Sequence, residues 1–359
     1  MIDAIRGLLP PLLGVLDLLF WVQRHLHPPV AAELAAELEP RIATVAAPLA
    51  TFEAAACPDE MRLMRDRLAE AAKETVELMT AFVDAVRTGG EIIDLYRALR
   101  RLARVQEGLY PLAPAFDAIS RFFLEPSARA DDERLGRLRE GSLRDGEPRV
   151  GVLHASNDRK ERGGFSLYAP ESSDGATPMP LIVALHGGSG HGRDFLWTWV
   201  REARTRGMLV LSPTARDRTW SIMGRDDFDA PALLEMFGYV TERYPVDRAR
   251  VLLTGMSDGG TYALLCGLRD DMPFTHLAPA CGVLHPFLFV NGGLQRAAGR
   301  PIYMINGTLD WMFPVQAARQ GRDVLTDVGA KLVYREIEDL SHTYPRDENP
   351  RILDWLASA

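Results

Sequence analysis

Ser257, with a glycine two residues away on each side, is the residue whose surroundings could most clearly do chemistry. A serine hydroxyl is a weak nucleophile until the chain presents it sharply and a base accepts its proton. The G-x-S-x-G spacing at 255–259 lies between an apolar run, 251–253, and a run typical of a helix, 261–268. A strand, a tight turn and a helix in that order would present the hydroxyl and aim helix N-terminal amides at developing negative charge. The pentapeptide alone does not separate a catalytic serine from an ordinary turn before a helix.

Asp310 and His342 could supply the acid and the base for this serine. Each follows an apolar run of strand length, and they come after the serine in the order Ser, Asp, His. His342 would take the serine proton and return it to the leaving group, while Asp310 would orient the imidazole and stabilise its charged form. Asp339 precedes His342 in a loop and Asp327 falls late in an expected helix, so both are weaker candidates for the acid.

A glycine-rich turn, His186-Gly187-Gly188, follows another apolar run at 181–185. Such a turn leaves backbone amides able to approach an anion, and an oxyanion hole needs two of them. One comes from this turn and the other from the residue after the nucleophile, so Gly188 and Asp258 are the candidates. The alternative interpretation of 186–188 is an ordinary turn between a strand and a helix.

Trp220 and Trp311 are candidates for lining a substrate site, because Trp311 adjoins Asp310 and Trp220 follows an expected strand end. Packing in a core or an interface explains both tryptophans equally well. The spacing of His, Asp and Glu residues indicates no catalytic metal site, and we expect neither a metal nor an organic cofactor.

From about residue 149 onward, runs of strand length alternate with amphipathic runs of helix length, which predicts a mainly parallel sheet covered on both faces. The first two strands could pair antiparallel. Ligands of such sheets bind beyond the carboxyl ends of the strands, where all the candidate residues above would lie. The expected strands are 150–154, 165–168, 181–185, 208–211, 251–254, 276–280, 301–305 and 332–337, and the expected helices are 195–206, 230–244, 259–268, 315–328 and 350–357.

Residues 1–125 are rich in Leu, Ala, Glu and Arg and poor in β-branched runs, which predicts an all-helical N-terminal domain. Apolar residues recur at helical spacing over 61–86 and again over 92–105, with Gly89-Gly90 between them. We expect the prolines to divide the region into several helices. The charged stretch 126–148 is predicted to link this domain to a catalytic domain at 149–359.

The apolar run 8–22 raises the question of targeting. It is too short to span a membrane, and it lacks the flanks of a signal peptide, so we interpret it as a helix packed in protein. A peripheral membrane contact is the less favoured alternative.

The chain's net charge of -8 and its estimated pI of 5.6 argue against binding to nucleic acid. Three scattered cysteines form no disulfide framework and favour a cytoplasmic setting.

With these motifs in place, residues 149–359 resemble the α/β-hydrolase superfamily, and within it the serine esterases that include polyhydroxybutyrate-depolymerase-like and phospholipase/carboxylesterase-like proteins. The resemblance is carried by the runs Leu185–Gly188, Tyr244–Asp247 with Arg250, Thr254–Gly260, Asn306–Asp310 and Ser341-His342. It implies an α/β-hydrolase fold, with Ser257 as nucleophile, Asp310 as acid, His342 as base, and Gly188 and Asp258 as oxyanion donors. It does not cover the N-terminal helical region.

The chemistry and the resemblance together predict a serine carboxylesterase that acts on small-molecule esters with short-chain or aryl groups. A thioesterase, lipase or peptidase could use the same triad, and a non-catalytic helical scaffold with a vestigial hydrolase domain is the alternative from another class. Three roles are open for the N-terminal helices: they could shape the substrate pocket, form a homo-oligomer interface, or dock a partner or membrane.

Overall fold

The computed structural model describes residues 1–144, 149–223 and 226–358, and its chain divides into two compact units, Met1–Arg139 and Glu140–Ala359. The division falls inside the stretch predicted as a linker. Most of α7 (Asp132–Ser142) belongs to the first unit, where Leu124, Ala128, Leu135 and Leu138 form a small buried cluster. Residues 145–148 of the stretch lie outside the described residues. That the two units are independent domains stays a proposal.

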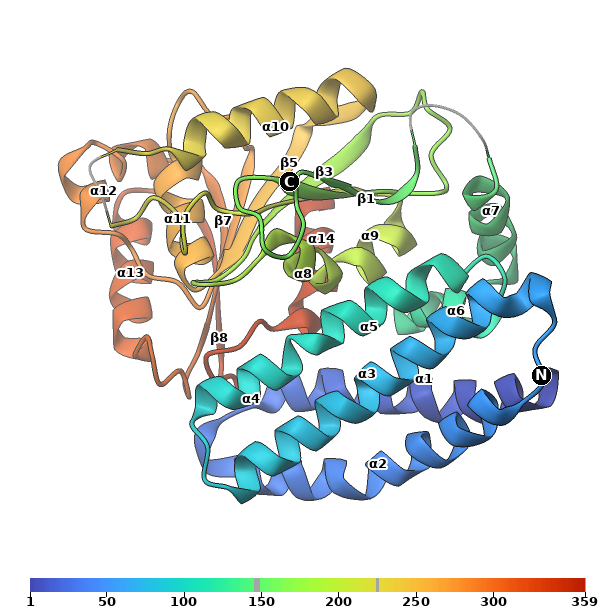
Figure 1. Ribbon diagram of the computed structural model, residues 1–359. Coiled ribbons are helices and arrows are strands. Elements are labelled where there is room, and N and C mark those ends of the chain that lie inside the picture. The colour runs from blue at the N-terminus through green and yellow to red at the C-terminus, as the bar shows by residue number, and fades with distance from the viewer. Residues whose placement is uncertain (145–148, 224–225, 359) are drawn as a thin grey trace. The chain divides into compact units, whose positions relative to one another are not determined.

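The first unit consists of helices, as the composition predicts (Figure 1). Apolar residues at spacings of three and four put one face of α3 inside, with Leu68, Ala72, Met79 and Phe82 fully buried. α3 packs against α2, α4 and α5, and α1 packs against α2. The helices are α1 (Ile2–His25), α2 (Ala31–Ala54), α3 (Arg62–Arg87), α4 (Ile92–Leu99), α5 (Arg101–Leu109), α6 (Asp117–Phe122) and α7, with short 3-10 turns between several of them.

The prolines at 28, 29, 58, 111 and 114 lie between helices, as predicted, but the prediction is wrong for Pro40 and Pro48. Pro10 and Pro11 lie inside α1, and Pro40 and Pro48 lie inside α2. Proline removes one helix hydrogen bond and leaves a carbonyl without its donor. None of the four prolines is buried, so water can reach the freed carbonyls. The expected single helix at 92–105 is in fact two, α4 and α5, which meet at Arg100.

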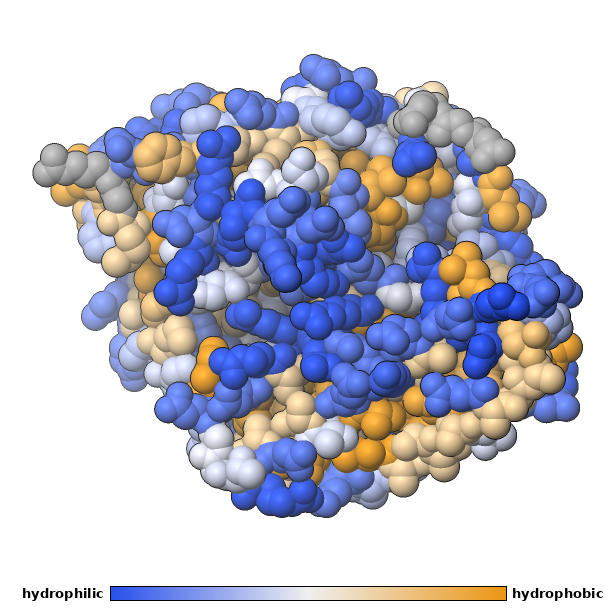
Figure 2. All heavy atoms as spheres, in the orientation of Figure 1, coloured by the Kyte–Doolittle hydropathy of each residue, from blue (hydrophilic) through white to orange (hydrophobic). Residues whose placement is uncertain are grey.

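The apolar run 8–22 is part of a longer helix than predicted. α1 has 24 residues and is long and apolar enough to cross a membrane by length and composition, so the prediction that this segment is too short to span one is wrong. The core helix of a soluble protein can be as long and as apolar as α1. One side of α1 is fully buried, including Leu8, Leu12, Leu16 and Leu19. The outer surface of neighbouring α2 is a mixture of apolar and polar side chains, seen along the lower edge of Figure 2.

The second unit is built on one eight-stranded sheet in the order β1-β2-β4-β3-β5-β6-β7-β8. β2 pairs antiparallel with both β1 and β4, and every other neighbouring pair is parallel, so the prediction of a mainly parallel sheet is confirmed. β3 and β6 are buried along their whole length, and β5 is buried over Leu252–Gly255 between them, as expected for a sheet with both faces covered. The strands are β1 (Gly151–Ala155), β2 (Phe165–Ala169), β3 (Met179–Leu185), β4 (Leu209–Pro213), β5 (Val246–Met256), β6 (His276–Ala280), β7 (Pro301–Gly307) and β8 (Lys331–Ile337).

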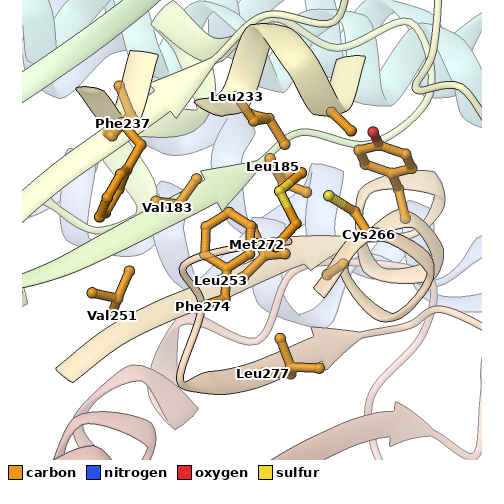
Figure 3. Close-up of a cluster of buried hydrophobic side chains, with 14 of the residues drawn as sticks. Val183, Leu185, Leu233, Phe237, Val251, Leu253, Cys266, Met272, Phe274 and Leu277 are labelled. Carbon is orange, nitrogen blue, oxygen red and sulfur yellow. The ribbon is translucent and has the colours of Figure 1, made fainter. Parts of the chain in front are cut away.

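The core of the second unit lies between the sheet and its helices. Figure 3 shows Phe237 and Leu233 from one helix and Cys266 from another, directed at Val183 and Leu253 of the central strands. The predicted helices are present, except that 195–206 is divided, and one short helix, α12, was not predicted. The helices are α8 (Gly192–Phe195), α9 (Val200–Arg206), α10 (Asp229–Arg243), α11 (Asp258–Gly267), α12 (Phe287–Val290), α13 (Val315–Asp327) and α14 (Asn349–Ser358).

Candidate active site

Ser257 occupies a sharp turn between β5 and α11. Its backbone is left-handed, with φ 58° and ψ −120°, a conformation that costs a non-glycine residue energy and persists only where the surroundings enforce it. The flanking glycines show what enforces it. A β-carbon on Gly255 would lie 2.5 Å from the backbone of Gly259, and one on Gly259 would lie 2.5 Å from the carbonyl of His186. The turn therefore closes only because both flanking residues lack side chains.

Ser257, His342 and Asp310 form one connected chain of side chains. His342 Nε2 lies 2.9 Å from Ser257 Oγ, and His342 Nδ1 lies 2.9 and 3.0 Å from the two Asp310 carboxylate oxygens. A carboxylate only accepts, so Nδ1 carries the proton and Nε2 is left to accept one from the serine. All three residues are buried, with 5–6% of each exposed. The structure thus brings together the three residues singled out from the sequence.

The loops after β7 and β8 hold this acid and base in place. Asp310 Oδ1 accepts hydrogen bonds from the amides of Met312 (2.9 Å) and Phe313 (2.8 Å), which fixes the carboxylate. The rings of Phe313 and Trp311 meet the imidazole of His342 edge-on, at centroid distances of 5.4 and 6.1 Å. Trp311 is 42% exposed, so it is accessible beside the base.

Gly188 lies on the turn after β3, next to Gly187, the residue of this turn that approaches Ser257. The turn is closed by the Gly190 amide, which donates to the Gly187 carbonyl (2.9 Å), and Ser189 within it is left-handed with φ 55°. A β-carbon on Gly187 would lie 3.5 Å from that of Ser257, so the turn approaches the serine closely. Asp258 is the first residue of α11, where a backbone amide has no partner within the helix.

His186 ties this turn to the loop after β4. Its Nε2 accepts from the Ala215 amide (3.1 Å), so Nδ1 carries the proton and donates to the Gly187 carbonyl (2.7 Å). Trp220 donates its indole N–H to the His186 carbonyl (2.7 Å) and stacks on Tyr262. Trp220 is only 2% exposed, so it packs beneath the turn and supports it, whereas Trp311 is exposed.

Two contacts here had no sequence signal. Thr219 Oγ1 donates to Asp258 Oδ2 (2.6 Å), which joins the loop after β4 to the first turn of α11. Tyr262 donates to Asp227 (2.6 Å), and burial raises the pKa of Tyr262, so its hydroxyl stays protonated. Thr219, Asp227 and Tyr262 stand outside the motifs, so the motifs gave no reason to single them out. Among the residues that the structure describes, no group of three or more His, Cys, Asp or Glu side chains is placed to hold a metal ion.

Comparison with known proteins gives distant relatives. No protein-family model matches the chain. A bifunctional acetylxylan esterase/xylanase of Neocallimastix patriciarum is 27% identical over 202 residues, which are 54% of this chain and 28% of that protein. An S-formylglutathione hydrolase of Rattus norvegicus is 26% identical over 161 residues, 38% of this chain and 57% of that enzyme. The chain thus covers less than two thirds of the length of these relatives.

A solved S-formylglutathione hydrolase from Staphylococcus aureus shares 15% identity with a TM-score of 0.48 over 57% of this chain and 97% of that one. The strand order, with the candidate residues after β3, β5, β7 and β8, defines an α/β-hydrolase fold preceded by a helical region. The resemblance to serine esterases of this superfamily, drawn from the motifs, is confirmed by the curated relatives.

Proposed function

We propose that this protein is a carboxylic ester hydrolase that forms an acyl-enzyme on Ser257. The observation that carries the proposal is the unbroken chain from Ser257 Oγ through His342 to Asp310, with contacts of 2.9–3.0 Å. A vestigial domain would be expected to lose one of the three or their alignment. The intact geometry therefore favours an enzyme over a non-catalytic scaffold.

In the proposed reaction, His342 Nε2 accepts the Ser257 proton as Oγ attacks the ester carbonyl. Asp310 holds the imidazole in the required tautomer and stabilises its positive charge. His342 then protonates the departing alcohol oxygen, which leaves the acyl group on Ser257. A water molecule, deprotonated by the same histidine, hydrolyses the acyl-enzyme and restores the serine.

The backbone amides of Gly188 and Asp258 are proposed to bind the negative oxygen of the tetrahedral intermediate. Gly188 is supported in this role by the close approach of its turn to Ser257. Asp258 is supported by its position at the start of α11, where the amide points out of the helix and the helix dipole favours negative charge. Each such donor contributes on the order of 10²–10³ in rate.

The proposed substrates are small-molecule esters with short acyl or aryl groups. The printed names of the two curated relatives refer to acetyl and formyl groups, which supports a small acyl group here. Trp311 is the better-supported of the two tryptophan candidates for substrate contact, because it is exposed beside His342 while Trp220 is buried under the turn. The name S-formylglutathione hydrolase also makes a thioester the second candidate substrate.

Hydrolysis assays with matched esters and thioesters test this function. Wild type should hydrolyse p-nitrophenyl acetate faster than the hexanoate and octanoate, and Ser257→Ala should lose at least 10³-fold in kcat. Ser358→Ala, which removes an exposed serine at the end of α14, is the matched control and should keep wild-type activity. A higher kcat/KM for acetyl thioesters than for oxygen esters would favour the second candidate. Activity that survives Ser257→Ala would overturn the proposal.

We also propose a cytoplasmic setting, because Cys57, Cys266 and Cys281 are all free thiols and two of them are buried. Assembly of copies through the N-terminal helices remains a proposal, as does a peripheral membrane contact through α1. Size-exclusion chromatography with light scattering tests the first, and co-sedimentation with anionic vesicles tests the second.

A further inference from the structure

The turn at 186–190 depends on the loop after β4 for support. Its left-handed residue, Ser189, donates its amide to the Arg218 carbonyl (2.7 Å). The two other supports, from Ala215 and Trp220 to His186, come from the same loop. That loop has no helix or strand from 214 to 223, so its position against the turn depends on hydrogen bonds such as these.

Arg162 makes hydrogen bonds to both segments. Its Nε donates to the Ala215 carbonyl (3.0 Å), its Nη1 donates to the Gly190 carbonyl (2.7 Å), and its Nη2 donates to the Asp217 carbonyl. All three acceptors are backbone carbonyls, two from the loop after β4 and one from the last residue of the turn. The planar guanidinium can serve three acceptors at once, which a lysine ammonium on a flexible stem cannot reproduce.

The position of Arg162 is itself fixed by the backbone. The Gly163 amide donates to the Thr214 carbonyl (3.2 Å), and the Thr214 amide donates to the Gly164 carbonyl (2.8 Å). These bonds anchor the segment between β1 and β2 to the end of β4. Gly164 allows this crossing, because a β-carbon there would lie 1.8 Å from the Ser156 carbonyl. The backbone next to Arg162 is therefore fixed, and this fixes the distance between the Arg162 backbone and the turn that its side chain contacts.

We propose that Arg162 is a positioning residue that holds the Gly188 amide in place for the developing oxyanion by joining the turn after β3 to the loop after β4. The inference rests on the proposed ester hydrolysis. Arg162 contacts no reacting atom and acts only through the backbone carbonyls that accept its hydrogen bonds. A misplaced oxyanion donor weakens binding of the transition state more than binding of the substrate, so its loss lowers kcat more than it raises KM.

The test compares Arg162→Met and Arg162→Lys with Arg250→Met, a control that removes an arginine paired with Asp247 at the start of β5. For p-nitrophenyl acetate, Arg162→Met should lower kcat by about 10- to 100-fold with KM changed less than about three-fold. Binding of a trifluoromethyl ketone, which forms a tetrahedral adduct with the serine, should weaken by the same factor as kcat/KM. Arg162→Lys should recover part of the loss, and Arg250→Met should match wild type.

Hydrogen–deuterium exchange provides a readout that does not depend on activity. Arg162→Met should speed exchange of amides in 186–191 and 215–218 while those of β6 and β7 stay protected. If Arg162→Met does not fold, the same measurements on Arg162→Lys decide. Wild-type kcat together with unchanged exchange at the turn would overturn the inference. An inactive wild type would overturn the proposed function instead, while faster exchange at the turn in the variant would still support the role of Arg162.

Discussion

A β-carbon on Gly188 would lie 2.6 Å from Oδ2 of Asp258, so a side chain at residue 188 would displace either the Asp258 carboxylate or the turn after β3. The Asp258 carboxylate is held over the turn by the hydroxyl of Thr219 (2.6 Å). The two residues proposed to supply the oxyanion amides are thus sterically coupled through the side chain of one of them.

Gly188→Ala should lower kcat/KM by about 10²-fold, because the new methyl group forces either the turn or the carboxylate out of place. Replacing Asp258 by Ala in the same chain removes the clash and should restore at least ten-fold of the loss. Steady-state kinetics on the two single variants and the double variant measure the coupling. A double variant no more active than Gly188→Ala would show that the close approach does not limit activity.

Asp310→Asn should reduce kcat by about 10³- to 10⁴-fold while leaving the fold intact. An asparagine amide can donate to Nδ1 and so favours the wrong tautomer of His342, in which Nε2 carries the proton. Kinetics with p-nitrophenyl acetate and a thermal melt check the two halves of this prediction. A kcat within ten-fold of wild type would mean that another group orients His342.

The strand ends could be predicted from sequence because each carries its own local signal. The runs before Gly188, Ser257 and Asp310 are apolar, of strand length, and end in glycine or in a polar residue. Parallel pairing then places their carboxyl ends on one edge of the sheet. The positions of Asp310 and His342 follow from topology, which is why the residues of the site could be chosen before their distances were known.

Arg162 and Thr219 could not be predicted in the same way. Their partners are backbone carbonyls and a carboxylate on segments distant along the chain, and such contacts leave no periodic pattern in the sequence. The sequence also could not predict that helices α1 and α2 continue through their prolines. Whether a proline ends a helix depends on whether water can reach the freed carbonyl, and burial is a property of tertiary structure.

The two tryptophans should respond differently to substitution. Trp311→Ala should raise KM for aryl esters several-fold with kcat within about three-fold, because an exposed ring beside His342 would contact the bound substrate. Trp220→Phe keeps a stacking ring but loses the hydrogen bond to the His186 carbonyl, so it should lower kcat a few-fold instead. Michaelis–Menten kinetics with phenyl and methyl esters separate the two effects. Equal changes in KM for both ester types in Trp311→Ala would contradict a ring contact.

Glu202 should make stability fall as pH rises. Burial raises the pKa of Glu202 above its usual value of 4.5, and the Arg346 guanidinium only partly opposes this. Between the unfolded and folded pKa values the unfolded chain has lost a proton that the folded protein keeps, so the free energy of unfolding declines over that interval.

Glu202→Gln should remove this decline, which amounts to roughly 1.4 kcal/mol for each pH unit between the two pKa values. The glutamine carbonyl can still accept from Asn349, whose amide lies 3.4 Å from the carboxylate in wild type. Urea unfolding at pH 4, 5.5 and 7 measures the difference between the variant and wild type. That difference should grow in favour of the variant as pH rises, and parallel curves would count against a raised pKa.

Covalent labelling with a fluorophosphonate tests the central claim most directly, because the reagent reacts with a serine only where a base and an oxyanion site activate it. Peptide mass spectrometry after labelling should find the adduct on Ser257 of wild type. Labelling should be absent in Ser257→Ala and slowed at least 10²-fold in His342→Ala. An adduct on a different residue, or a wild type that is not labelled at all, would contradict acyl transfer through Ser257.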